Sequence, residues 1–501
     1  MLVVFGLLLA VSQALSVSAQ TSLSAWASGA AMGAAEPTAE QARLLEAMED
    51  TDEAHKALFD KDRFPSATSC ADCHPKHYRQ WSVSQHAYAQ MSPIFNAMAG
   101  KILLLTNGTN GDFCIRCHTP VGMNLGEPEF ASNIDRHPTS REGVTCIVCH
   151  RVDQAYGKLS GRLAIHEGPI TEPIYGPSGE NMELDRVIDE TGLATEYDPD
   201  NPTRKVHGEA QKFFQIATSG HCGSCHDVTL INGFRLEEAF SEFKNTPANK
   251  AGVRCQDCHM GLQPGKIVAD IDDPDFERKN FDHGPAAKVG AVETESRKLT
   301  NHMFIGPDYS VLHPALFPLH TSIKEEDEKG DNTIDGWTIR QWLTFDWKAG
   351  WGDEIWEYET DGPDETEFPV WEADYTTGWD SPDDREAARE VVLSNLRLLK
   401  EVELQRLKLL RNGYVLGDIV PTEINNNTFE FKVQVKNGTD GHNVPTGFDA
   451  ERLVWLDVRV FDADGKQIMV SGDLDPNGDV RDLHSLYVHN HELPQDKQLF
   501  S

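Results

Sequence analysis

Residues 70–74 read Cys-Ala-Asp-Cys-His, and this pattern decides the fold because it recurs at every cysteine of the 501-residue chain. Cys-x-x-Cys-His is the attachment motif of c-type haem. Two thiols three positions apart can add to the two vinyl groups of one porphyrin, and the adjacent imidazole then ligates the iron. The five copies are Cys70/Cys73/His74, Cys114/Cys117/His118, Cys146/Cys149/His150, Cys222/Cys225/His226 and Cys255/Cys258/His259. The sequence therefore predicts five covalently bound haem c groups.

Two other kinds of site use paired cysteines, and the pattern argues against both. A zinc ribbon needs no histidine after each pair. A thioredoxin-like redox pair would occur once, near a βαβ unit. Here all ten cysteines fall in five pairs, and each pair is followed by histidine.

The five motifs lie close together, between Cys70 and His259. A stretch this short cannot enclose five porphyrins in separate cores, so the haems must contact one another and form the core. We therefore expect a mainly α fold with much irregular loop around a packed multihaem core. A row of closely spaced irons would be a route for electrons.

The second axial ligand decides whether each iron is saturated or open to substrate. Five of the twenty histidines belong to the motifs, so fifteen remain for this position. The candidates put forward as iron ligands are His86, His302, His207, His442 and His166, with His137, His221, His313 and His320 as weaker ones. We expect His77 at the surface. Met123 and Met303 are alternatives that would raise the potential.

The stretch that follows the first motif resembles a known family. Trp81, Ser84, His86 and Ala87 are similar to the Trp and Ser-x-His-Ala of multihaem cytochromes that include the tetrahaem partner of hydroxylamine oxidoreductase. The segments Glu142–Cys146 and Cys222–Val228 also resemble this superfamily, so the likeness covers roughly residues 65–310. It implies electron transfer and a distal-ligand role for His86.

The chain departs from the catalytic members of that superfamily. Pentahaem nitrite reductases carry lysine in place of one proximal histidine, whereas all five motifs here end in histidine. The hydroxylamine oxidoreductase pattern has eight haems. The resemblance therefore implies electron transfer more than nitrogen chemistry.

The N-terminus has the pattern of an export signal. An apolar run over 3–11 and small residues over 16–19 predict a signal peptide over 1–19, although no basic residue precedes the run. No later segment reaches the roughly 18 apolar residues of a membrane helix. Since covalent haem is attached after export, we expect a periplasmic or outer-surface protein without a membrane span. Residues 20–65 read as a linker with one acidic helix over 36–60.

After the haem domain, placed at 66–320, the composition changes. Lys324–Arg385 carries 20 acidic and five basic side chains and seven of the ten tryptophans. Such large rings are normally buried, so this tract should be folded rather than disordered. We expect it to pack against the haem core. A docking surface for a basic redox partner is the alternative.

The remainder predicts one long helix and a small β domain. Helical spacing relates the apolar residues Val392, Leu396 and Leu399, so we expect a helix over 383–411. This helix ends the segment 321–415. From Thr428 the apolar period changes to two, and Leu453–Val460 reads as a second strand. We expect an all-β, sandwich-like domain over 421–501 with too few strands to close, so this sequence is expected to be truncated. Its Gly441–Gly447 loop would carry His442 toward the haems, like a similar loop in other exported multihaem cytochromes.

The net charge of -35 excludes a nucleic-acid binder, because phosphate backbones demand a basic surface. We expect an exported pentahaem relay with mostly bis-histidine haems, whose partners are basic redox proteins or other cytochromes. The alternative is an oxidoreductase with one open haem acting on a small nitrogen or sulfur compound. A subunit of a larger cytochrome assembly is a third interpretation that the sequence does not separate from the first.

Overall fold

The computed structural model describes residues 63–152, 154, 161–179, 181–196, 204–230, 233–316, 337, 339–353, 357, 378–425, 428–448 and 452–496. These residues belong to one compact unit, residues 62–501. The predicted signal peptide, the predicted helix over 36–60, His320 and most of the acidic tract lie outside the described residues. No helix in the described ranges is long and apolar enough to cross a bilayer.

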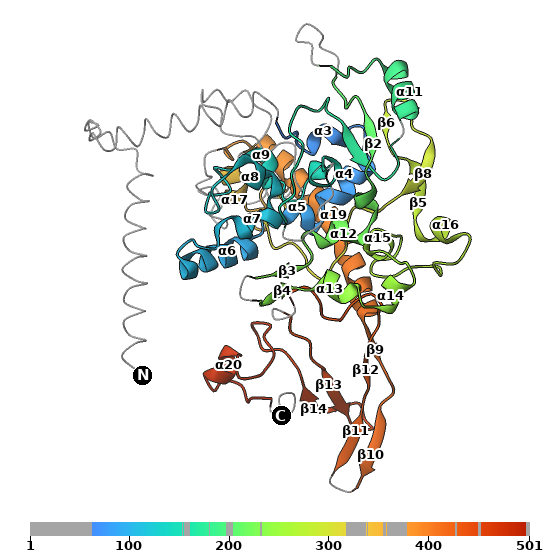
Figure 1. The fold of residues 1–501 in the computed structure, drawn as a ribbon. Helices are drawn as coiled ribbons and strands as arrows, with labels where there is room; N and C mark the ends of the chain where they lie inside the picture. Colours follow the sequence, from blue (N-terminus) through green and yellow to red (C-terminus); the bar gives the residue numbers. More distant parts are fainter. Residues whose placement is uncertain are drawn as a thin grey trace, which may run out of the picture. The chain divides into compact units, whose positions relative to one another are not determined.

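The haem-motif region consists of short helices joined by loops (Figure 1). The helices are α3 (Thr68–Ala71), α4 (Pro75–Ser82), α5 (Gln85–Tyr88), α6 (Pro93–Thr106), η1 (Gly111–Phe113), α7 (Ile115–His118), α8 (Pro120–Leu125), α9 (Pro138–Arg141), α10 (Cys146–His150), α11 (Asn181–Thr191), η2 (Phe214–Ala217), α12 (Ser219–Gly223), α13 (Ala239–Phe243), α14 (Pro247–Lys250), α15 (Cys255–His259) and α16 (Phe276–Asn280). Most span only one or two turns, so they depend on tertiary packing for stability.

The strands of this region pair only two at a time. They are β1 (Ile174–Gly176), β2 (Ala210–Lys212), β3 (Val228–Thr229), β4 (Arg235–Glu237), β5 (Asp282–Pro285), β6 (Lys288–Val289), β7 (Val292–Glu293) and β8 (Ser296–Leu299). β1 and β2 are parallel, with Ile174 opposite Ala210, whereas β3–β4, β5–β8 and β6–β7 are antiparallel. Two-stranded ladders are marginal alone.

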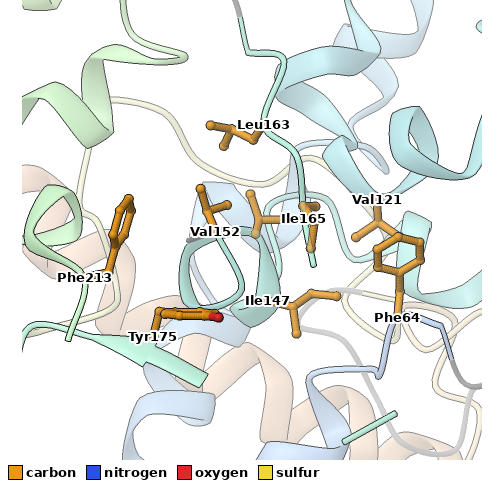
Figure 2. Close-up of a cluster of buried hydrophobic side chains, with 9 residues drawn as sticks. Phe64, Val121, Ile147, Val152, Leu163, Ile165, Tyr175 and Phe213 are labelled. Atoms are coloured by element: carbon orange, nitrogen blue, oxygen red, sulfur yellow. The ribbon is translucent and has the colours of Figure 1, made fainter. Parts of the chain in front are cut away.

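A cluster of buried apolar side chains anchors the third motif through Ile147 (Figure 2). Ile147 and Val148, the two residues between the cysteines of the third motif, are each 1% exposed in a cluster with Phe64, Val121 and other apolar side chains. In a helical turn the positions i, i+3 and i+4 share one face, and the positions between them point elsewhere. The third motif thus uses its intervening residues as an anchor and leaves its thiols and imidazole on the other face.

The predicted helix over 383–411 is present as α19 (Pro382–Gly413), the longest helix described. The Ser381 hydroxyl caps it by accepting from the Asp384 N–H, and Asp383 and Asp384 complement the helix dipole in the first turn. Val392 is fully buried and packs with Trp342 and Trp379, while Val402 packs with Val83 and Met303 of the haem region. The described tryptophans of the acidic tract therefore pack on α19, and α17 (Ile339–Thr344) packs there with them.

A buried ion pair fixes the first turns of α19. The Arg385 guanidinium donates from Nε and Nη2 to Glu357 at 2.7 and 2.5 Å, and the two side chains are only 4% and 3% exposed. We predict that Arg385→Ala destabilises the holoprotein by roughly 3–5 kcal/mol, because it leaves the Glu357 carboxylate buried and unpaired. Urea unfolding measures this. Arg397→Ala, at an exposed position of the same helix, should stay within about 0.5 kcal/mol of wild type. Equal effects of the two substitutions would contradict this role.

The C-terminal strands follow α19 directly (Figure 1). They are β9 (Tyr414–Leu416), β10 (Val420–Ile424), β11 (Phe429–Lys432), β12 (Val435–Asn437), β13 (Val458–Phe461) and β14 (Gln467–Ser471), followed by α20 (Leu486–His489). They pair as β9–β12, β10–β11 and β13–β14, all antiparallel. The second predicted strand begins later than expected, at Val458. The sandwich-like packing stays a prediction, because the strands described here form only two-stranded ladders.

Candidate functional site

Each motif forms a single helical turn. The His74 N–H donates to the Cys70 carbonyl at 2.8 Å, and the His226 N–H donates to the Cys222 carbonyl at 2.9 Å. Residues i, i+3 and i+4 of a helix share a face, so one turn presents both thiols and the imidazole to the same side. All ten cysteines are free of disulfides, as thioether attachment requires.

The five motifs line one cavity. It has a volume of about 2620 Å³, and all ten motif cysteines and all five motif histidines contribute to its wall. A single small-molecule or cofactor site occupies roughly 300–1,000 Å³, so this chamber has room for several such groups. The thiols, the imidazoles and the size of the chamber fit covalently attached haem.

Four motif imidazoles are oriented in the same way. Their Nδ1 atoms lie against backbone carbonyl oxygens: His74 on Ala286 at 2.7 Å, His118 on Ala89 at 3.0 Å, His150 on Tyr175 at 2.8 Å and His259 on Ile305 at 3.2 Å. A carbonyl can only accept, so Nδ1 carries the proton and Nε2 is left with its lone pair for a metal. Burial lowers the pKa of all four, to about 4 for His118 and His259, which keeps them neutral.

His226 differs from the other four. Its Nδ1 lies 3.5 Å from the Oε1 of Glu237, a carboxylate with 7% of its side chain exposed. Burial would lower the pKa of His226, but the Glu237 carboxylate outweighs it and the pKa is raised. Although 53% of the His226 side chain is accessible, the residue lines the chamber.

Three motif histidines face a second imidazole. The ring centres are 6.2 Å apart for His226 and His86, 6.2 Å for His259 and His442, and 6.4 Å for His150 and His302. Two imidazoles that bind one metal from opposite sides, each through a bond of about 2 Å, have ring centres separated by about this distance. Each partner comes from a remote part of the chain, so the fold brings together residues that sequence proximity does not.

Hydrogen bonds and a close backbone contact fix the segment that carries His86. The Trp81 indole donates to the Val144 carbonyl at 2.8 Å, and the Val144 N–H donates to the His86 carbonyl at 2.9 Å. Ser84 caps α5 by accepting from the Ala87 N–H. Gly143 has φ +65°, and a Cβ there would lie 2.5 Å from the His86 carbonyl oxygen. These contacts join the segment after the first motif to the approach of the third.

Glu142 supports the same junction. Its carboxylate accepts from the Ser66 hydroxyl, from the Ala67 N–H at 2.9 Å and from the Thr145 hydroxyl at 2.5 Å. Burial raises the pKa of Glu142 to about 6, although these hydrogen bonds oppose the shift. Glu142 therefore links the chain before the first motif to the chain before the third.

The Glu242 carboxylate holds the residues that follow His442 in its loop, and Asn437 Nδ2 donates to the His442 carbonyl at 2.7 Å. Glu242, on α13, accepts from the Asn443 N–H at 3.0 Å, from Asn443 Nδ2 at 2.8 Å and from Thr446 Oγ1 at 2.7 Å. The Asn443 carbonyl lies 2.7 Å from His442 Nδ1, which leaves Nε2 for the chamber.

We predict that Glu242→Ala releases this loop and separates His442 from His259. Hydrogen bonds to charged groups contribute roughly 1.5–3 kcal/mol each, and three are lost together. The expected result is carbon monoxide binding to about one additional ferrous haem per chain. The control is Glu277→Ala, at an exposed carboxylate of α16. If Glu242→Ala binds no more carbon monoxide than Glu277→Ala, the hydrogen bonds to Glu242 are not what holds His442 in place.

The other two motif histidines, His74 and His118, are not paired in this way with a second imidazole among the described residues. His207 lines the chamber, as His74 does, and burial, with a smaller contribution from its proximity to His74, lowers the pKa of His207 to about 4, so it is the candidate opposite His74. His77 is 6.3 Å from His74, but it follows three residues later and cannot reach the opposite face of the same porphyrin. Against His118 stacks Phe95, with ring centres 3.7 Å apart. Among the described histidines, none faces His118 at the spacing of the three pairs.

Other candidates lie elsewhere. His166 is exposed, does not line the chamber and contacts Glu172 at 3.2 Å. His313 and His137 also lie outside the chamber wall, as do Met123 and Met303, whereas His221 lines it. The expectation that His77 is a surface residue is wrong: it lines the chamber and its ring packs on His302 at 4.8 Å. The position of His166 therefore gives no support to its predicted role as an iron ligand.

Four residues of the site had no signal in the sequence analysis. Phe95 and Met98 lie on the chamber side of α6, and Glu237 and Glu242 follow the fourth motif. Acidic residues are too common in this chain for two of them to be conspicuous. Glu237 could be found only from the pairing of β3 with β4, and Glu242 only from the approach of the C-terminal loop.

The motifs contact one another in a definite order. Thiols of different motifs lie close enough to shift one another's pKa in three pairs: Cys70 with Cys146, Cys117 with Cys225, and Cys222 with Cys255. Cys149 lies near Cys225, which connects the third motif to the fourth. The fourth motif therefore adjoins the second, third and fifth.

Part of the haem-motif region matches a known protein family. Residues 69–151 match the family model described as cytochrome c554 and c-prime, a stretch that includes the first three motifs and His86. Neither the curated proteins nor the solved structures gave a significant match. Over the matched stretch the chain is similar to a family of multihaem c-type cytochromes, which carry covalently bound haem and function in electron transfer.

Proposed function

We propose that this chain is an exported pentahaem cytochrome that relays electrons between redox partners. The observation that carries the proposal is that five CxxCH motifs line one chamber and contact one another in a connected order. When bound, haem iron supplies reversible one-electron chemistry. The chain's own residues hold each group by two thioethers, orient the proximal imidazole and supply most of the distal ones.

The ligand set favours transfer over catalysis at most positions. His86, His302 and His442 would complete bis-histidine coordination opposite His226, His150 and His259, and His207 would do so opposite His74. An iron with two imidazoles has no free position for substrate. The acidic surface would stabilise ferric iron and attract a basic partner or another cytochrome, at the periplasm or outer cell surface.

One observation favours the alternative, an oxidoreductase with one open haem. Among the described histidines, none faces His118 at the ring spacing of the three pairs, and Phe95 stacks on the side of the His118 ring rather than across from its Nε2. Met98 lines the same part of the chamber wall, on the same helix. A haem at the second motif would then have a five-coordinate iron or a methionine ligand, and a five-coordinate iron could bind a small nitrogen or sulfur compound.

Low-temperature electron paramagnetic resonance of the oxidised protein, quantified per haem, tests both functions. The relay predicts low-spin ferric signals from at least four of five haems that nitrite, hydroxylamine and cyanide leave unchanged. A stoichiometric high-spin signal that these ligands shift would support the open haem at the second motif. High-spin iron at most positions would contradict the relay.

A further inference from the structure

The residue that distinguishes the fourth motif is Glu237. It ends β4, which pairs with β3 so that Glu237 lies opposite Val228, two residues after His226. The antiparallel pairing returns the chain to the motif it has just left. As a result Oε1 of Glu237 lies 3.5 Å from Nδ1 of His226, at the outer limit of a hydrogen bond.

The other four proximal histidines contact a neutral group at the same atom. Their Nδ1 partners are backbone carbonyls of Ala286, Ala89, Tyr175 and Ile305. A carbonyl fixes the tautomer of the imidazole. A carboxylate does the same and also adds a full negative charge beside the ring.

The charge of Glu237 is poorly compensated by its surroundings. Its side chain is 7% exposed, and Oε2 is buried without a hydrogen-bond partner among the described residues. Gly447 packs so closely that a Cβ there would lie 3.3 Å from Oε1. The charges of Arg452 and Glu237 attract each other, but the Arg452 guanidinium donates to Asp308 at 2.9 Å. A buried charge with few partners acts strongly on its neighbours, because the local dielectric constant is low.

We propose that Glu237 is a positioning residue that sets the potential of the haem held by Cys222, Cys225 and His226 below that of the other four. A carboxylate beside Nδ1 makes the imidazole a stronger donor to the metal, and its negative charge stabilises ferric over ferrous iron. The inference rests on the proposed function, since it requires haem at the fourth motif. That motif adjoins the second, third and fifth. A low-potential haem there would be the centre hardest to reduce between the haems at those three motifs.

The test is a redox titration followed by electron paramagnetic resonance on the intact, haem-loaded protein. The two rings at this centre are inclined by 47°, against 15° for His259–His442 and 24° for His150–His302. Since ring inclination changes the g values of low-spin ferric haem, this centre should have its own signal. We expect Glu237→Gln to move its midpoint potential positive and to change the other signals much less.

The matched control is Glu238→Gln, which removes the same charge one residue further on. Glu238 is 37% exposed and pairs with Arg235 at 3.2 Å, away from His226. Its substitution should leave the signal of the fourth-motif haem at its wild-type potential. A second variant, Glu237→Asp, keeps the charge but shortens the side chain, and should give a smaller positive shift.

Two results would overturn the inference: no positive shift in Glu237→Gln, or an equal shift in Glu238→Gln. Peptide mass mapping of the wild-type protein separates this failure from failure of the proposed function. If the peptide with Cys222 and Cys225 carries haem and the potential does not respond, only the role of Glu237 is lost. If that peptide carries no haem, the proposed function itself fails at this motif.

Discussion

A chain with all ten motif cysteines replaced by alanine is expected not to reach a native state. The chamber that the motifs line has a volume of about 2620 Å³. At roughly 24 cal/mol per Å³, keeping a cavity of 2620 Å³ open would cost on the order of 60 kcal/mol. Domains are stable by only about 5–15 kcal/mol. The haems must therefore supply the core, and without them the chamber collapses.

The expected product is a compact state with helical far-ultraviolet circular dichroism but no near-ultraviolet signal from the tryptophans and no cooperative melting transition. The haem-loaded protein under the same conditions is the control. Cooperative unfolding of the haem-free chain, with the urea dependence of the loaded protein, would show that the haems are not the core.

The second large effect is expected for His86→Ala. The His86 ring is 6.2 Å from that of His226 and comes from the segment after the first motif. Its removal should convert one haem in five from low-spin to high-spin, and that haem should be the one at the fourth motif rather than the first. Added imidazole should restore the low-spin signal, because it replaces the missing ligand without changing the fold.

The control for this experiment is His166→Ala. His166 is exposed and contacts Glu172, so its removal should leave the spectrum unchanged. An unchanged spectrum in His86→Ala as well, or a high-spin signal that imidazole does not rescue, would contradict the assignment of His86.

The sequence predicts what depends on local spacing. The motif cysteines and histidines follow from covalent chemistry, and α19 follows from apolar residues at helical spacing within a helix of about nine turns, from Pro382 to Gly413. His86 was found because its neighbours Trp81 and Ser84 form a recognisable context. These features need no knowledge of the tertiary fold.

What the sequence does not predict depends on long-range packing. His302 lies about 150 positions after the His150 that it faces, and no periodicity relates the two. His77 looks like a surface residue because charged Lys76 and Arg79 flank it, yet it lines the chamber. The role proposed for Glu237 depends on one strand pairing, and the position of His442 depends on three hydrogen bonds to Glu242. The described part of the tryptophan-rich tract packs on α19 and on Ala315 and Leu316 at the end of the segment assigned to the haem domain, and its packing on the haems themselves stays a prediction.

The intact mass of the protein shows whether five haems are covalently bound. The measurement is made under denaturing conditions, which remove any metal held only by coordination. We expect the mass of the chain, after loss of the predicted signal peptide, plus five haem groups, with each group mapped to one CxxCH peptide. The mass of the unmodified chain, with ten free thiols or with zinc lost on denaturation, would contradict it.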